Sequence, residues 1–151
     1  QATYTLSELE AAGHARADLS LPKKRRVGGK FGNRRTACNN GHIHASGIEA
    51  KRCSELHLMQ KAKAIHSLLI QPKFLLEPGF LRNGRPYRAT YYKGDFLYVA
   101  KDGEIHTSIC EDVKAVNRKT GEPIATALFW DKWKRAKARR PDIEFRIVLE
   151  G

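Results

Sequence analysis

Residues 91–115 read YYKGDFLYVAKDGEIHTSICEDVKA, and this stretch decides how the rest of the chain is expected to fold. It predicts two β-strands joined by a tight turn at Asp102-Gly103, because Asp-Gly supplies the positive φ that a two-residue hairpin needs. We expect Asp95 near the middle of the first strand. On the second strand Asp112 and Lys114 share one face, since successive side chains of a strand point to opposite faces.

The two aspartates and the lysine of this hairpin predict metal-assisted chemistry on a phosphate. Paired carboxylates can hold a hard cation that prefers oxygen ligands, and an ammonium group beside them can stabilise charge on the attacked phosphate. A simpler alternative is a salt bridge between Asp95 and Lys114. The aromatic neighbours of Asp95 favour the metal, because a carboxylate buried among them is costly without a compensating cation.

Composition favours a polyanionic partner. The 151 residues include 28 Lys and Arg against 16 Asp and Glu, which gives a formal net charge of +12 and a calculated pI near 9.9. No apolar run is long enough to cross a bilayer or to form the core of a signal peptide, so we expect no membrane association and a cytoplasmic protein. The odd count of three cysteines indicates reduced thiols. Nucleic acid is therefore the expected partner.

Basic residues concentrate in two regions. Between Leu19 and Ile48 there is no acidic residue, and the helix expected near the C-terminus carries a second basic cluster. Both could be solvated charge runs without a partner, but together they would give positive surfaces that follow a phosphate backbone. The residues expected to contact DNA are Lys23, Lys24, Arg25, Arg26, Lys30, Arg34, Arg35, Lys134, Arg135 and Lys137.

The remaining signals predict an α/β (α+β) fold, in which helices flank a central mixed sheet that begins as an antiparallel meander. Ser46-Gly47-Ile48-Glu49 is a capping box that opens a helix running to about Ala64. A second helix is expected over 124–139 and a final strand over 143–149. The other expected elements are a short helix near 5–10, an apolar strand over 65–76, and hairpin turns at Asn39-Asn40-Gly41 and Asn83-Gly84.

A zinc site is an alternative for one part of the chain. Cys38, His42, His44 and Cys53 offer sulfur and nitrogen ligands at short spacing. His42 and His44 share a strand face, but no Cys-x-x-Cys pair is present. The buried stripe of the helix also accounts for Cys53, so packing is the preferred interpretation of that cysteine.

Five segments carry a resemblance to known proteins. They are Ser46-Gly47-Ile48-Glu49-Ala50, Gln71-Pro72-Lys73-Phe74, Asp95-Phe96, Glu111-Asp112-Val113-Lys114 and Pro141-Asp142-Ile143-Glu144-Phe145. In this order they resemble a family of small proteins encoded by phages and prophages. That family is similar to the PD-(D/E)XK nuclease superfamily, which includes restriction endonucleases and Holliday junction resolvases. The resemblance covers about 30–150.

The resemblance implies a restriction endonuclease-like core in which Glu49, Asp95 and Asp112 bind Mg²⁺, with Mn²⁺ able to substitute, and Lys114 completes the motif. Gly94 stands where the superfamily motif has proline. Glu111 competes with Asp112 for the second acidic position. Strand alternation favours Asp112, and a bulge in the strand would reverse that choice.

The leading hypothesis is a phage-encoded, metal-dependent DNA endonuclease that hydrolyses phosphodiester bonds, with junctions or branched DNA as a candidate substrate. Residues 1–29 would form an N-terminal helix and basic arm, and 30–151 the nuclease-like domain. A junction substrate would favour a homodimer, since two symmetric cuts need two sites. The alternatives are a catalytically inactive DNA-binding or regulatory protein, and a factor that binds an acidic host protein.

Overall fold

The computed structural model describes residues 33–150. The helix expected near 5–10 and the basic residues Lys23 to Lys30 lie outside this range. Within this range the helices are α2 (Gly47–Lys61) and α3 (Ala127–Arg139). The strands are β1 (Thr36–Ala37), β2 (Ile43–His44), β3 (Ile65–Ile70), β4 (Lys73–Glu77), β5 (Phe80–Arg82), β6 (Arg85–Tyr87), β7 (Thr90–Lys93), β8 (Phe96–Asp102), β9 (Ile105–Ala115) and β10 (Ile143–Glu150).

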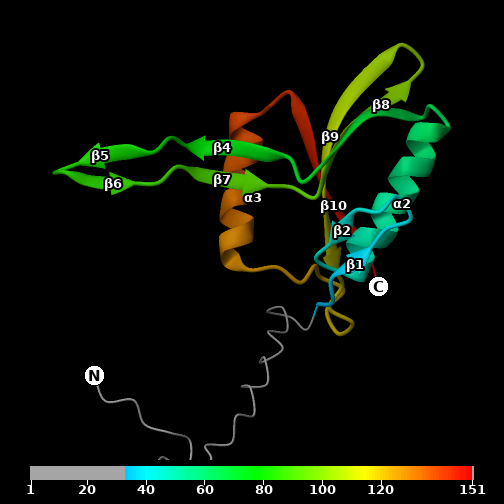
Figure 1. Cartoon of the computed structure of the whole chain (residues 1–151), viewed down its shortest axis with the longest axis horizontal. Coiled ribbons are helices and arrows are strands. Elements are labelled where there is room, and N and C mark those ends of the chain that lie inside the picture. The colour runs from blue at the N-terminus through cyan, green and yellow to red at the C-terminus, as the bar shows by residue number, and fades with distance from the viewer. Residues whose placement is uncertain (1–32, 151) are drawn as a thin grey trace, which may run out of the picture.

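A four-stranded mixed sheet forms the centre of the molecule, in the order β10-β9-β8-β3 (Figure 1). β8 pairs antiparallel with β3 and β9, and β10 pairs parallel with β9. The predicted α+β class and mixed sheet are confirmed. Neither helix in the described range is long and apolar enough to cross a membrane.

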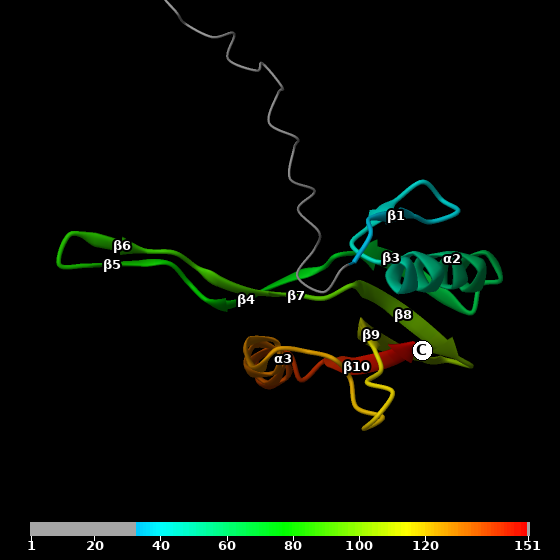
Figure 2. The ribbon, with the colours of Figure 1, turned by 90° about the horizontal axis from the view of Figure 1, so that it is seen from below.

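The two helices cover opposite sides of this sheet. Ile109 and Val113 of β9 join a buried cluster with Cys53 and Leu56 of α2. Cys110, between them in sequence, belongs to a second cluster that includes Ala136 of α3. Figure 2 shows the helices as separate layers beside the sheet. Alternation along β9 therefore assigns each side chain to one helix or the other.

Both helices begin at side-chain caps. Ser46 is the N-cap of α2, and its hydroxyl oxygen accepts from the Glu49 backbone N–H at 3.4 Å, as the capping box predicts. α3 begins at Ala127, three residues later than expected, with Thr126 as its N-cap. The delay has a local cause, because the Ile124 N–H donates to the Ala115 carbonyl and keeps the preceding chain extended.

A long two-stranded ribbon projects from the body of the molecule (Figure 1). β4 pairs with β7, and β5 pairs with β6 around the predicted Asn83-Gly84 turn. Both turn residues have positive φ, 50° and 72°, as a type I′ turn requires. The single strand expected over 65–76 is instead interrupted at Gln71-Pro72, where the chain passes from the sheet into the ribbon.

Asp95 lies between β7 and β8, where the chain passes back from the ribbon into the sheet, and not in the middle of a strand as expected. The Gly94 N–H donates to the Pro72 carbonyl at 3.0 Å, and the Gln71 N–H donates to the Asp95 carbonyl at 2.8 Å. A Cβ on Gly94 would stand 2.6 Å from Cys110 Sγ. Proline at this position would lose the hydrogen bond and clash with the thiol, so glycine is required here.

Candidate functional site

Asp95 is tied to β9 by two hydrogen bonds. Its backbone N–H donates to the Glu111 carbonyl at 3.0 Å, and its carboxylate Oδ2 accepts from the Val113 N–H at 2.8 Å. Burial raises the pKa of Asp95 to about 6; the negative charge of Glu49 adds to this rise and the Val113 N–H opposes it. Within the described residues Oδ1 has no hydrogen-bond partner among the side chains and is free to bind another group.

Asp112 sits on the α3 side of β9, as strand alternation predicts, and only 2% of it is exposed. Its Oδ1 accepts from Lys114 Nζ at 3.2 Å, and its Oδ2 accepts from the Tyr92 hydroxyl. Burial raises the pKa of Asp112 to about 6, Lys114 opposes the rise, and Glu49 adds to it. The lysine therefore pairs with Asp112, and not with Asp95 as the salt-bridge alternative required.

Glu111 lies on the opposite side of β9 and is fully engaged there. Arg52 of α2 donates to both of its oxygens, at 2.9 Å from Nε and 2.7 Å from Nη2. The Tyr98 hydroxyl donates to Oε1 as well. The pairing of β9 with both neighbours runs without a register shift, so no bulge turns Glu111 toward Lys114. Its role is an ion pair that joins α2 to the sheet.

Glu49 completes the cap of α2 and borders a cavity. Its Oε1 accepts from the Ser46 hydroxyl at 3.0 Å, and its Oε2 accepts from the Ala45 N–H at 3.3 Å. With Lys114, Glu49 lines a cavity of about 350 Å³. Its negative charge adds to the rise in pKa of both Asp95 and Asp112. Among the described residues, however, the three predicted acids do not come close enough together to share one ion.

The predicted DNA-contacting residues that fall in the described range are on the surface. Arg34 and Arg35 are exposed just before β1, and Lys134 and Lys137 are exposed on α3. Arg135 is half-buried and pairs with Glu77 at 3.4 Å and Asp131 at 3.6 Å. Lys23, Lys24, Arg25, Arg26 and Lys30 lie outside the described residues.

Sequence reasoning missed the basic character of the ribbon. Its residues 73–93 include five basic side chains and one acidic one: Lys73, Arg82, Arg85, Arg88 and Lys93 against Glu77. Phe80 and Tyr87 stack across the ribbon with ring centroids 4.7 Å apart. The signal was available, because Arg82-Asn83-Gly84-Arg85 puts an arginine on each side of a predicted turn.

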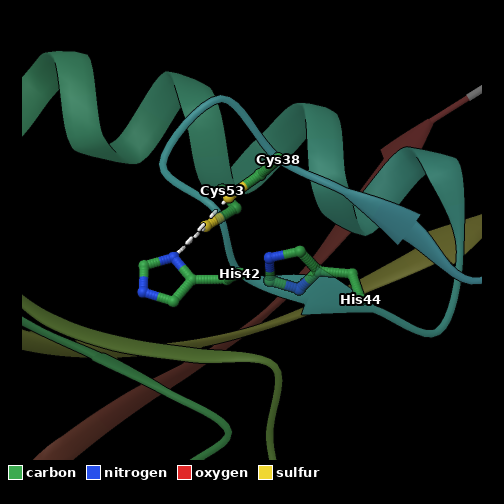
Figure 3. Close-up of side chains that lie close together, drawn as sticks. All are labelled: Cys38, His42, His44 and Cys53. Carbon is green, nitrogen blue, oxygen red and sulfur yellow. Dashed lines mark hydrogen bonds between the residues drawn. The ribbon is translucent and has the colours of Figure 1, made fainter.

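A second group of side chains meets where the β1–β2 hairpin lies on α2. The ligand atoms of Cys38, His42, His44 and Cys53 all lie within 4.8 Å of one another, and Figure 3 shows the four side chains turned toward a common point. In the described part of the chain this is the one group of three or more Cys, His, Asp or Glu side chains close enough to share an ion. Helix packing thus explains only part of the position of Cys53.

Comparison with known proteins identifies a family. No curated protein and no solved structure was found to match the chain. A family described as protein of unknown function (DUF1064) matches residues 29–140. The match includes both helices, the ribbon, the acids around Lys114 and all four residues of the Cys/His group. Because it spans more than half of the 151 residues, the chain belongs to the DUF1064 family.

Proposed function

We propose that this protein is a metal-dependent DNA endonuclease related to the PD-(D/E)XK superfamily. The observation that carries the proposal is the engagement of both aspartates at one short segment of β9. Lys114 Nζ lies 3.2 Å from Asp112 Oδ1, and the N–H of Val113, the residue between them, donates to Asp95 Oδ2 at 2.8 Å. The charge of Glu49 acts on both aspartates. Burial raises the pKa of both aspartates to about 6. A divalent cation stabilises the charged form of a partly desolvated carboxylate, which supports the use of these two aspartates as metal ligands.

The residues present fit Mg²⁺ or Mn²⁺ by their chemistry, since the nearest donors are carboxylate oxygens. Asp95 and Asp112 would hold the cation, which would supply Lewis-acid polarisation of the phosphate and a more acidic water. Lys114, 3.2 Å from Asp112 Oδ1, would donate to a phosphate oxygen as charge develops on it. Tyr92 keeps the Asp112 carboxylate oriented by its hydroxyl. Glu49 would become a third carboxylate ligand once its Oε1 no longer accepts the hydrogen bond from the Ser46 hydroxyl.

DNA would reach this site along basic surfaces that flank it. The ribbon carries Arg82 and Arg85 at its tip, and α3 presents Lys134 and Lys137. A two-stranded ribbon fits the major groove of duplex DNA. With a net charge of +12, binding to the phosphate backbone would be strong at low salt and would weaken steeply as salt rises.

A second candidate function is DNA binding without cleavage. It is favoured by the engaged state of the acids: Glu49 is held by its cap, and Asp112 by Tyr92 and Lys114. In the described residues no three carboxylates come close enough together to share an ion. This alternative keeps the nuclease-like fold and the basic ribbon but lacks turnover.

Cleavage of supercoiled and branched DNA with Mg²⁺ or Mn²⁺ tests both candidates. Asp112→Asn removes one charged ligand at almost constant shape, and Lys114→Ala removes the ammonium group. We expect each to slow cleavage at least about 100-fold. Glu144→Gln is the matched control, because Glu144 is an exposed acid on β10 whose partner is Arg146, and its cleavage should equal that of the wild type.

The outcomes separate the two functions. Equal cleavage by the wild type and all three variants would overturn the assignment of the site. Salt-sensitive DNA binding by the wild type without cleavage in either metal would establish the second candidate instead.

A further inference from the structure

We infer that Cys38, His42, His44 and Cys53 form a structural zinc site that attaches the β1–β2 hairpin to α2. The inference is independent of the nuclease proposal, because none of these four residues is among the acids proposed to bind Mg²⁺, which are Glu49, Asp95 and Asp112. The ligands come from three places: the hairpin loop (Cys38 and His42), β2 (His44) and the second turn of α2 (Cys53). They converge only in the folded chain.

The spacing of the ligand atoms suits a tetrahedral ion. Zn–S bonds of about 2.3 Å and Zn–N bonds of about 2.0–2.1 Å place tetrahedral ligands roughly 3.3–3.8 Å apart. His42 Nδ1 lies 3.6 Å from Cys38 Sγ and 3.8 Å from Cys53 Sγ (Figure 3). All four ligand atoms are within 4.8 Å of one another, so small side-chain rotations would close the remaining distances around an ion.

Burial and an unpartnered nitrogen also favour an ion at this place. Cys53 is fully buried, and His44 is 2% and Cys38 7% exposed. His44 Nε2 is buried and has no hydrogen-bond partner among the described residues. Buried polar atoms are almost always paired, because an unpaired one loses its water without compensation. A metal ion bound to this nitrogen would remove that cost.

The local backbone presents two of the ligands to the same point. The Cys38 N–H donates to the His42 carbonyl at 2.9 Å, and the Gly41 N–H donates to the Cys38 carbonyl at 3.0 Å. Gly41 has φ of 81°, a conformation that favours glycine. This tight turn brings Cys38 and His42 back together. The ring of His57 stacks on that of His42 at 5.3 Å between centroids and holds it in place.

The donor set selects zinc. Two sulfurs and two imidazole nitrogens in a compact arrangement suit Zn²⁺, whereas Mg²⁺ requires oxygen ligands. Four protein ligands leave no open position, which is typical of a structural site and not of a catalytic one. A disulfide between Cys38 and Cys53 would use the same sulfurs, but it would not explain why ring nitrogens of His42 and His44 also lie close to them.

The hairpin needs such an attachment. β1 and β2 pair through only two residues each, and an isolated hairpin of that size is unstable in water. One further bond joins it to the helix, from the Asn39 N–H to Ser54 Oγ at 3.2 Å. A zinc ion would link 38–44 to residue 53 and so fix the segment that leads into the start of α2.

Metal content of the full-length chain, purified after growth in zinc-supplemented medium, tests the inference. We expect one zinc per chain by elemental mass spectrometry, and a Co²⁺-substituted protein with the visible absorption of tetrahedral cobalt and a sulfur-to-cobalt charge-transfer band. Cys38→Ser and Cys53→Ser should each lose the metal. Cys110→Ser is the matched control, because Cys110 is equally buried but lies in the other hydrophobic cluster.

A rescue variant distinguishes ligation from folding. His42→Cys keeps four ligands, so it should retain one zinc and intensify the charge-transfer band, whereas His42→Ala should retain neither. Three results would overturn the inference: wild-type protein that folds without bound zinc or cobalt, a Cys38–Cys53 disulfide in protein purified without reductant, or loss of metal in Cys110→Ser equal to that in Cys53→Ser.

Discussion

The carboxylate group, which consists of Glu49, Asp95 and Asp112, and the Cys/His group around His42 differ in how their donor atoms are engaged by the rest of the protein. In the carboxylate group Asp112 is bonded to Tyr92 and Lys114, and Glu49 to Ser46. In the Cys/His group the donors face one another, and His44 Nε2 has no partner in the described residues.

This difference indicates how tightly each group is expected to hold a metal ion. Carboxylates that hydrogen bonds already hold in place can exchange a cation for protein partners at small cost, as a site that binds and releases metal with its substrate must do. Sulfur and nitrogen donors that lack other partners depend on a permanent ion. We therefore expect a weakly held hard cation at the first group and a tightly held zinc ion at the second.

The largest expected effect comes from removing the weakly held cation. Buffer exchange of the full chain into metal-free buffer should stop DNA cleavage, with a fall in rate of about 1,000-fold, roughly 4 kcal/mol in activation free energy, and Mg²⁺ should restore it. The zinc content should stay at one per chain throughout. Asp112→Asn should likewise keep its zinc while losing cleavage. Loss of zinc and cleavage in parallel, with recovery by zinc alone, would contradict the division between the groups.

Sequence predicted well what depends on neighbouring residues. The Ser46-x-x-Glu49 cap, the positive-φ turn at Asn83-Gly84 and the separation of Glu111 from Asp112 all follow from local periodicity and turn chemistry. The choice between the two acids needed only the alternation of a regular strand, and β9 is regular along its length.

What sequence could not predict depends on tertiary contacts. Asp95 lies at a break because the Gly94 N–H donates to the Pro72 carbonyl where the ribbon leaves the sheet. Gly94 is the one local sign of that break, and its partner Pro72 is distant in sequence. Arg52 is one of many basic residues until the fold carries it to Glu111. Cys53 joins Cys38 only across the hairpin and the helix, so its spacing alone favoured packing.

A smaller effect, on stability alone, should come from Arg52, and it tests the separation of the two adjacent acids. Arg52→Ala leaves Glu111, 1% exposed, as a buried carboxylate without its cation, which should lower the free energy of unfolding by about 3 kcal/mol. Arg52→Met combined with Glu111→Gln should recover much of that loss, as urea denaturation would measure. If Arg52→Ala instead lost cleavage without losing stability, Glu111, and not Asp112, would be the acid that acts in the metal site.

The smallest expected effect concerns the ribbon, which extends the comparison from metal binding to DNA binding. Arg82→Ala combined with Arg85→Ala removes two charges from the exposed tip without touching either metal group. Affinity for duplex DNA should fall about 10-fold, or ~1.4 kcal/mol, and the slope of log affinity against log salt should decrease by about 1.8, since each phosphate contact contributes about 0.9.

Lys61→Ala combined with Lys101→Ala is the control, because it removes the same charge from exposed positions on α2 and β8. It should leave both quantities almost unchanged. If the two double variants weaken binding equally, the ribbon contributes only to the overall charge. If only the Arg82/Arg85 variant loses affinity, the DNA contacts the tip of the ribbon and extends along it toward Lys114.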